Sequence, residues 1–245
     1  MESGRLIEDV PRQGADNMAI DEMLLRRSSM SASPTLRFYF WDRPTVSLGY
    51  FQSLNAREDH APSLTLPLVR RATGGGAIVH HQELTYSLII PITDRLKNQH
   101  RDYYFAVHRG VIATLAKLGI EAELAEGTQA RQDDPFLCFE RRADGDVLIQ
   151  GHKVLGSAQR RHASALLQHG SLLLQKSIFA PSLRGIQDLS RSAIETETLI
   201  FELCNGIQAS IKNAWNSKPL VQTELEEATE IRRLKFGHET WTGKR

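Results

Sequence analysis

The chain has 245 residues, 41% of them hydrophobic, and its 30 lysines and arginines nearly balance its 29 aspartates and glutamates. This length fits one large domain or two small ones, and the balance of charge excludes the bulk positive field that drives nonspecific nucleic-acid binding. The N-terminal residues include Glu2, Glu8 and Asp9 without an apolar run, and no stretch approaches the length of a membrane span. We therefore expect a cytoplasmic protein with no signal peptide, no nucleic-acid partner and no membrane partner.

The first part of the chain predicts one helix followed by a block of strands. Residues 16–25 begin with cap-type side chains and then repeat apolar positions at spacings of three and four, which predicts an amphipathic helix. Aromatic and β-branched runs then alternate with turn residues such as Asp42-Arg43-Pro44, a pattern typical of strands. The predicted strands cover 36–41, 45–50, 66–71, 77–80 and 84–90.

Helix and strand patterns mix in the second part of the chain. Apolar residues recur at helical spacing over 103–118, where Gly119 marks the end, and over 194–215. Residues 223–226 resemble a capping box that opens a last helix. Gly145 and Gly151 fit hairpin turns. The predicted strands in this part cover 120–124, 146–149, 153–158 and 165–174.

The order of these elements indicates the fold class. Strands come in consecutive blocks, and helices are inserted singly or gathered at the end, which is typical of an α+β fold and differs from regular βαβ alternation. No internal repeat, low-complexity linker or evident boundary divides the chain, and the charged segment 126–134 is the one we expect to be most mobile. We expect a single domain over 1–245, with mixed and antiparallel sheets flanked by helices.

Three consecutive glycines, Gly74-Gly75-Gly76, lie between two of the predicted strands. Glycine in a strand context marks a bulge, a bend or a place where a ligand approaches the backbone, and a purely structural turn is the alternative. Arg71 and Thr73 add a cation and a hydroxyl beside the bare amides, a setting that suits a carbonyl, a phosphate or a thioester on a pantetheine arm. The spacing matches neither the Rossmann nor the Walker pattern, and no serine-hydrolase elbow is present.

Two cysteines and one lysine are further candidates for chemistry. Cys204 lies among apolar residues at helical spacing and reads as a small core residue. Cys138 lies in a predicted loop rich in charge and proline, where a lone cysteine is either incidental or a nucleophile. Lys153 precedes the step Gly156-Ser157-Ala158, where its ammonium can neutralise an oxyanion or a phosphate; the alternative is a solvated strand lysine.

Three histidines are possible metal ligands, but the sequence pattern around them does not favour a metal site. His80, His81 and His169 are candidate ligands, but no acidic residue or cysteine stands at ligand spacing with them. Adjacent histidines in a strand also point to opposite faces. We expect no metal.

Several segments, in order along nearly the whole chain, resemble the lipoate-protein ligase and octanoyltransferase family. Residues 70–80, followed by Glu83-Leu84-Thr85-Tyr86-Ser87, look like the family signature. Further segments that resemble family motifs are 17–22, 44–52, 153–159, 167–171 and 235–241. The resemblance implies a single biotin/lipoate protein ligase-like domain that acts on medium-chain acyl groups.

Two chemistries exist in this family, and the resemblance favours one of them. Ligases activate a free acid with ATP, whereas octanoyltransferases take the acyl chain from acyl carrier protein. The segment 83–87 resembles the transferase branch, and the chain stops where many ligases continue into an accessory domain. Cys138 stands where the cysteine-dependent octanoyltransferases place their nucleophile, although 141–146 replaces the Ser and Tyr-Glu residues expected after it.

The resemblance therefore implies an octanoyltransferase of lipoate biosynthesis and protein lipoylation that works through a Cys138 thioester, with Lys153 as the second catalytic residue. The donor is octanoyl-acyl carrier protein, and the acceptor is a lysine of a lipoyl domain or of the glycine cleavage H protein. We expect a monomer without a cofactor. The residues expected to bind substrate are Arg71, Thr73, Gly74, Gly75, Gly76, His80, Tyr86, Gly156, Ser157, Ala158, His169 and Gly170, with Ile78, Val79 and Leu88 lining an acyl tunnel.

Two alternatives stay open at this point. The first is an ATP-dependent lipoate-protein ligase that forms lipoyl-adenylate and needs ATP and Mg. The second is a noncatalytic carrier-binding module that has kept the fold and lost the activity.

Overall fold

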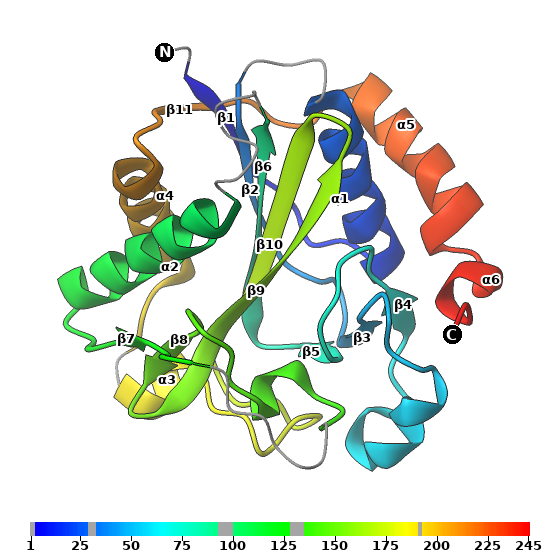
Figure 1. Ribbon diagram of the computed structural model, residues 1–245, viewed down its shortest axis with the longest axis horizontal. Helices are drawn as coiled ribbons and strands as arrows, with labels where there is room; N and C mark the ends of the chain where they lie inside the picture. The colour runs from blue at the N-terminus through cyan, green and yellow to red at the C-terminus, as the bar shows by residue number, and fades with distance from the viewer. Residues whose placement is uncertain (1–2, 29–32, 93–99, 128–134, 191–192) are drawn as a thin grey trace.

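The computed structural model describes residues 3–28, 33–92, 100–127, 135–190 and 193–245, and a long mixed sheet runs through the middle of this part (Figure 1). Most of its strand pairs are antiparallel, but the first strand is parallel to both of its neighbours. Within the described ranges the strand order is β11 (Trp215–Ser217), β1 (Gly4–Glu8), β2 (Thr35–Tyr39), β6 (Glu83–Pro91), β10 (Ala165–Leu173), β9 (His152–His162), β8 (Val147–Ile149) and β7 (Glu123–Leu124).

A second, smaller sheet lies beside the first and carries the glycine segment on its connections. Its described strands are β4 (Leu68–Arg70), β3 (Thr45–Leu48) and β5 (Ile78–His80), with β3 in the middle. The segment 71–77 connects β4 to β5, so the triple glycine lies at the end of this sheet. The predicted mixed and antiparallel architecture is confirmed.

Helices cover both faces of the large sheet. In Figure 1, α2 (His100–Lys117) and α4 (Thr196–Ile211) lie on one side, and α1 (Gly14–Ser28) and α5 (Gln222–Ile231) lie on the other. The short helix α3 (Ile186–Ser190) lies near β8, and α6 (Glu239–Thr242) lies near the C-terminus. Short helical segments also form at Asn55–Asp59, Ala61–Ser63, Cys138–Glu140 and Arg232–Phe236.

The core follows from this layering. One apolar cluster fills the space between the large sheet and the helices α2 and α4, and a second lies under α1 and α5.

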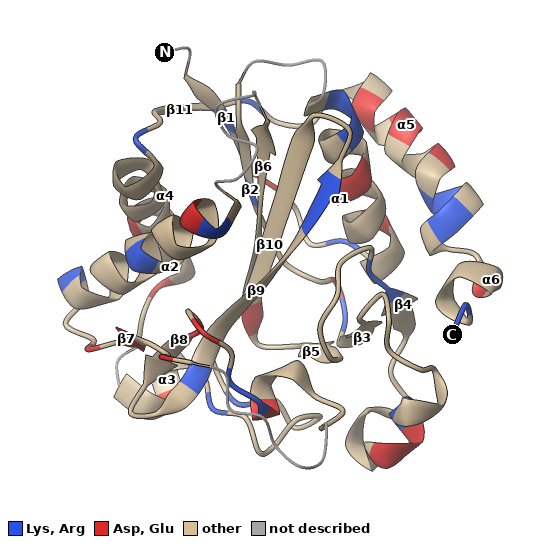
Figure 2. Cartoon of the chain, viewed as in Figure 1, with Lys and Arg blue, Asp and Glu red and all other residues tan. Residues whose placement is uncertain are grey.

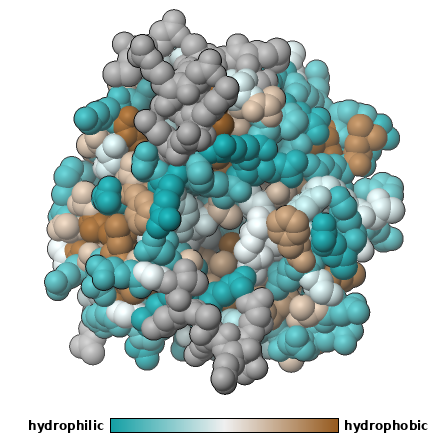
Figure 3. All heavy atoms as spheres, in the orientation of Figure 1, coloured by the Kyte–Doolittle hydropathy of each residue, from teal (hydrophilic) through white to brown (hydrophobic). Residues whose placement is uncertain are grey.

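β10 carries no charged residue and is buried along its whole length, whereas the helices and loops carry most of the charge (Figure 2). Hydrophilic residues cover most of the face drawn in Figure 3, with apolar patches between them. No helix among the described residues is both long and apolar enough to cross a membrane.

The predicted helices and strands are present in the predicted order, and the differences are at short elements and ends. The predicted helix 194–215 ends early because Lys212 adopts a left-handed φ of 55°, and Trp215 already belongs to β11. Gln150 and Gly151, with φ of 49° and 73°, form the predicted two-residue hairpin turn between β8 and β9. Gly145 also has a positive φ, but it lies in the longer connection from β7 to β8 and forms no tight hairpin.

A buried network of ion pairs and hydrogen bonds connects α1 to the strands β2, β6 and β10. Arg37 of β2 is fully buried and lies 2.7 Å from Asp9 and 2.8 Å from Asp21 of α1. Asp21 also accepts a hydrogen bond from Ser87 of β6 and faces His169 of β10 at 3.2 Å. Burial raises the pKa of Asp21, but the surrounding donors and cations, His169 and Arg37 first among them, more than offset this and lower it.

The variant Arg37→Met is expected to lower the free energy of unfolding by about 3–5 kcal/mol, because Asp21 then remains buried without its arginine partner and Asp9 keeps only Arg12. Urea unfolding measures the loss. The matched control is Arg43→Met, since the Arg43 side chain is 59% exposed and pairs with Asp42 at 3.4 Å. That control is expected to change stability by less than about 1 kcal/mol. Equal effects of the two variants would contradict the structural role given to Arg37.

Candidate active site

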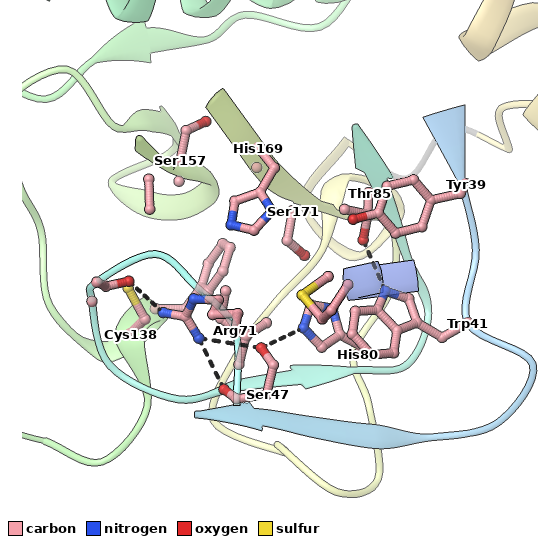
Figure 4. Close-up of a pocket in the computed structure, with 18 residues that line it drawn as sticks. Tyr39, Trp41, Ser47, Arg71, His80, Thr85, Cys138, Ser157, His169 and Ser171 are labelled. Atoms are coloured by element: carbon pink, nitrogen blue, oxygen red, sulfur yellow. Dashed lines mark hydrogen bonds between the residues drawn. The ribbon is translucent and has the colours of Figure 1, made fainter. Parts of the chain in front are cut away.

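A pocket opens where the two sheets meet, and most of the residues predicted from the sequence line it. The lining comes from α1, from β2 and its following loop, from β3 and β5 of the small sheet and the glycine segment before β5, from β6, β9 and β10, and from the segment Cys138–Glu140. The lining residues are Met18, Tyr39, Trp41, Ser47, Arg71, Gly74, Gly75, Ile78, His80, Thr85, Cys138, Phe139, Gly156, Ser157, Ala158, His169, Gly170 and Ser171. In Figure 4, Arg71 lies between Cys138 and His80, with His169 above it.

Four residues of the predicted set do not line the pocket and contact the lining from behind. Thr73 contacts His169, Gly76 and Lys153 contact Cys138, and Tyr86 contacts Ser157. These four residues are buried.

Gly75 and Gly76 of the glycine segment, and Gly49 beside them, lie where a side chain does not fit. A Cβ on Gly49 would lie 1.8 Å from the carbonyl oxygen of Gly75, and Gly75 has a φ of +95°. Arg71 holds this loop from inside: its Nη2 donates to the carbonyl oxygens of Gly74 and Gly76 at 2.8 and 2.7 Å. Both close approach and the positive φ require glycine here.

Arg71 also donates from Nη1 to the Ser47 carbonyl at 2.9 Å. Both terminal nitrogens of the guanidinium are therefore engaged by protein oxygens. Burial lowers the pKa of Arg71 to about 10, with Cys138 acting to raise it and Arg141 to lower it. We infer that Arg71 shapes the loop and contributes charge to the pocket.

The substitution Gly49→Ala is expected to lower the free energy of unfolding by about 1–3 kcal/mol, because the added methyl group overlaps the Gly75 carbonyl and the backbone must move. Thermal unfolding measures the change. Gly74→Ala is the matched control, since its Cβ would meet only Phe51 at 3.8 Å. A change within about 0.5 kcal/mol is expected for the control. A Gly49→Ala variant as stable as the control would contradict the tight packing described here.

Cys138 lies directly against the glycine segment. Its backbone N–H donates to the carbonyl oxygen of Ala77 at 2.8 Å, and Ala77 donates in turn to Phe136 at 2.9 Å, so 136–138 runs beside the segment like a short strand. A Cβ on Gly75 would lie 3.7 Å from the Cys138 sulfur. Of the predicted mobile loop 126–134, residues 128–134 lie outside the described residues.

The surroundings of Cys138 favour the thiolate. Burial alone raises the pKa of the Cys138 thiol, but the cations of Lys153, Arg71 and Arg141 and the backbone N–H of Gly76 more than offset this. The pKa of Cys138 therefore lies below its ordinary value. A thiolate is the nucleophilic form of cysteine. Of the two sequence interpretations of Cys138, this environment favours the nucleophile.

Lys153 is buried beside the sulfur, which excludes the solvated strand lysine. It is 7% exposed, and its Nζ lies 3.9 Å from the Cys138 sulfur and 3.3 Å from the Cys138 carbonyl oxygen. Its closest charged partner is Asp146, at 2.8 Å. Gly156 makes room for this side chain, because a Cβ there would lie 2.6 Å from the Lys153 Cε.

Two histidines line the pocket, each backed by a buried carboxylate. His80 contacts the Ser47 hydroxyl at 2.7 Å and Glu83 at 3.1 Å. His169 contacts the Thr73 hydroxyl at 2.6 Å and Asp21 at 3.2 Å.

A third buried histidine, His108 of α2, lies behind the pocket. Its Nδ1 bonds to the carbonyl oxygen of Gly145 at 2.6 Å, so Nδ1 carries the proton and Nε2 accepts from the Ser157 hydroxyl at 2.6 Å. Burial lowers the pKa of His108 to about 4, which keeps the ring neutral. Sequence reasoning missed His108; a polar residue on the apolar face of the predicted helix 103–118 was the available signal.

Of the three residues expected to line an acyl tunnel, Ile78 lines the pocket, whereas Val79 and Leu88 do not. Val79 packs in the core of the small sheet, and Leu88 packs in the large core. Neighbouring residues in a strand point to opposite sides, so Ile78 and Val79 cannot both face the pocket. Cys204, which is half-buried against the large core, fits the predicted core role.

A thiol of lowered pKa beside a buried ammonium, at a largely apolar pocket, suits acyl transfer through a cysteine thioester, which is the chemistry of one class of acyltransferase. The chain belongs to the family described as the lipoyl protein ligase A/B catalytic domain, whose model matches residues 13–195. The sequence resemblance to this family is thereby confirmed.

Two similar proteins carry the name octanoyltransferase LipM. The protein named octanoyltransferase LipM of Carboxydothermus hydrogenoformans is 41% identical over 182 residues, which cover 73% of this chain and 67% of that protein. The protein of the same name from Kyrpidia tusciae is 30% identical over 261 residues, covering 94% of this chain and 95% of that protein.

Solved structures show the same fold. The putative lipoate protein ligase Ta0514 of T. acidophilum with bound lipoic acid superposes with a TM-score of 0.79 at 22% identity, covering 99% of this chain and 100% of that one. A bipartite lipoate protein ligase from Thermoplasma acidophilum, described together with its E2 lipoyl domain, gives a TM-score of 0.79 at 21% identity, covering 99% and 97%. The predicted biotin/lipoate protein ligase-like fold is confirmed.

Proposed function

We propose that this chain is an octanoyltransferase that moves an octanoyl group from acyl carrier protein, through a thioester on Cys138, to a lysine of an apo lipoyl-carrier protein. The observation that carries the proposal is the pair of Cys138 and Lys153, with 3.9 Å between Sγ and Nζ at the wall of the pocket. The names of the similar proteins support the same reaction.

The first half-reaction acylates the enzyme. The Cys138 thiolate attacks the carbonyl carbon of the octanoyl thioester, a new C–S bond forms, and the bond to the donor sulfur breaks. The donor leaves as a thiolate and takes a proton from water. Lys153, whose ammonium is buried beside the sulfur, stabilises the charge that collects on the carbonyl oxygen.

The second half-reaction forms the amide. The neutral amine of the acceptor lysine attacks the Cys138 thioester, the C–N bond forms and the C–S bond breaks. Cys138 leaves as a thiolate again, and the nitrogen gives up one proton to water. Because the donor thioester supplies the driving force, the proposed reaction needs no cofactor, ATP or metal.

The apolar part of the pocket suits the tail of the acyl group. Met18, Trp41, Ile78 and Phe139 line it, and each methylene removed from water contributes about 0.8 kcal/mol.

The proposed acceptor is a lipoyl domain, the kind of partner described for the archaeal ligase of the same fold, or the glycine cleavage H protein. We place the reaction in the cytoplasm and propose that the chain acts as a monomer.

A transfer assay without ATP tests the proposal. The chain is incubated with octanoyl-acyl carrier protein and an apo lipoyl domain, and the mass of the lipoyl domain is followed. Octanoylation without ATP is expected. Modification that occurs only with free octanoate or lipoate and ATP, with release of pyrophosphate, would identify a ligase. A lipoyl domain that stays unmodified under both conditions would identify a noncatalytic binding module.

A further inference from the structure

Asp146 is a buried carboxylate that the two half-reactions above do not use. It is 1% exposed, and its Oδ2 lies 2.8 Å from the Lys153 Nζ and accepts a hydrogen bond from the Ala143 N–H at 2.7 Å. Among the residues that the structure describes, Asp146 supplies the carboxylate that pairs with Lys153.

Helix α2 fixes the turn that carries this carboxylate. Tyr104 donates its hydroxyl to Asp146 Oδ1 at 3.3 Å, and His108, one helical turn further on, donates to the carbonyl oxygen of Gly145 at 2.6 Å. Residues four apart on a helix lie on the same face. Two contacts from one face therefore hold Asp146 against Lys153.

The charge on the Cys138 sulfur, beside Lys153, differs between the two half-reactions. The sulfur is an anion before acylation and part of a neutral thioester afterwards. Arg71 and Arg141 act on the same sulfur as further cations. A buried ammonium without a counter-ion is costly, so the acyl-enzyme needs an anion other than the sulfur.

We propose that Asp146 is a positioning residue that keeps Lys153 charged and aimed at the acyl carbonyl while Cys138 carries the acyl group. This inference rests on the proposed octanoyl transfer. During acylation the thiolate itself can serve as the counter-ion of Lys153. During amide formation both reactants, thioester and amine, are neutral, so the ammonium depends on Asp146.

The variant Asp146→Asn tests this by separating the half-reactions. Asparagine has nearly the same shape and can still accept a hydrogen bond from Ala143, so it removes the charge and keeps the local contact. Acylation by octanoyl-acyl carrier protein is expected to change less than about threefold, and transfer from the preformed acyl-enzyme to the lipoyl domain to slow about tenfold or more. Intact mass at timed intervals measures both rates and should show acyl-enzyme accumulating at steady state.

Three further variants make the result specific. Asp146→Glu restores the charge and is expected to recover most of the second rate. Asp146→Ser, which also accepts a hydrogen bond and has no charge, is expected to repeat the selective loss, and thermal unfolding checks that each variant is folded. Asp144→Asn is the matched control, because Asp144 is on the same turn but pairs with Arg101 on the surface, and both rates should stay near wild type.

Equal slowing of both half-reactions in Asp146→Asn and Asp146→Ser would overturn the inference, because a merely structural role affects both. Unchanged rates in both neutral variants would also overturn it. A wild-type chain that transfers octanoate without ever forming an acyl-enzyme would instead overturn the proposed function, and with it this inference.

Discussion

Replacing Cys138 by serine is expected to lower the rate of octanoyl transfer by about three orders of magnitude or more, the scale seen when a nucleophile is removed from a covalent mechanism. The hydroxyl is similar in shape to the thiol, so the backbone hydrogen bond from the Cys138 N–H to the Ala77 carbonyl is expected to remain. The cations that lower the pKa of the Cys138 thiol would act on a hydroxyl that is far less acidic, so the serine is expected to stay protonated. Transfer to the lipoyl domain measures the loss.

Cys204→Ser is the control for that experiment. Cys204 is half-buried on α4, and burial together with the nearby Glu8 raises the pKa of its thiol. The variant is expected to transfer octanoate at the wild-type rate. If Cys138→Ser also retains the wild-type rate, the covalent route is wrong.

Replacing Lys153 by methionine is expected to lower kcat for transfer by about two to three orders of magnitude, because the ammonium no longer stabilises the charge on the carbonyl oxygen. The pKa of the Cys138 thiol should rise at the same time, since Lys153 is the cation that lowers it most. The thiolate then forms only at higher pH, so the pH profile of Cys138 alkylation by iodoacetamide should shift upward. Both readouts come from one variant.

Two further variants separate charge from folding. Lys153→Met leaves Asp146 buried without a partner, which is itself destabilising, so the double variant that adds Asp146→Asn removes both charges together. It is expected to fold more stably than Lys153→Met and to remain slow. Lys117→Met, at a lysine whose side chain is 61% exposed on α2, should match the wild type. An unchanged alkylation profile in Lys153→Met would show that Lys153 does not act on the sulfur.

Most residues that line the pocket could be predicted from the sequence, because most of them lie in segments that resemble motifs of the family. The run of three glycines marks a close approach that the sequence predicts, but that the approach is between Gly49 and Gly75 is seen only in the structure. Gly156 was predicted to contact substrate; it lines the pocket and also makes room for Lys153. The role of a glycine depends on what lies beside it, and a sequence does not show its neighbours across the fold.

The features that could not be predicted from the sequence are mostly contacts between segments that lie far apart in the chain. Ala77 pairs with Leu137, which brings Cys138 to the glycine segment across a long stretch of chain, and no spacing rule predicts that bridge. Asp146 is predicted as the first residue of a strand. Its ion pair with Lys153 becomes visible only once the hairpin turn brings β8 and β9 together. β11 has three residues, too few to show any periodicity, and is defined by its pairing with β1.

The intact mass of the enzyme tests the central claim most directly. The full chain is incubated with octanoyl-acyl carrier protein in the absence of a lipoyl acceptor, and the mass is read before and after treatment with hydroxylamine. We predict one octanoyl group per chain, removed by hydroxylamine and absent from Cys138→Ser. An unmodified chain that still octanoylates an added lipoyl domain would contradict the account.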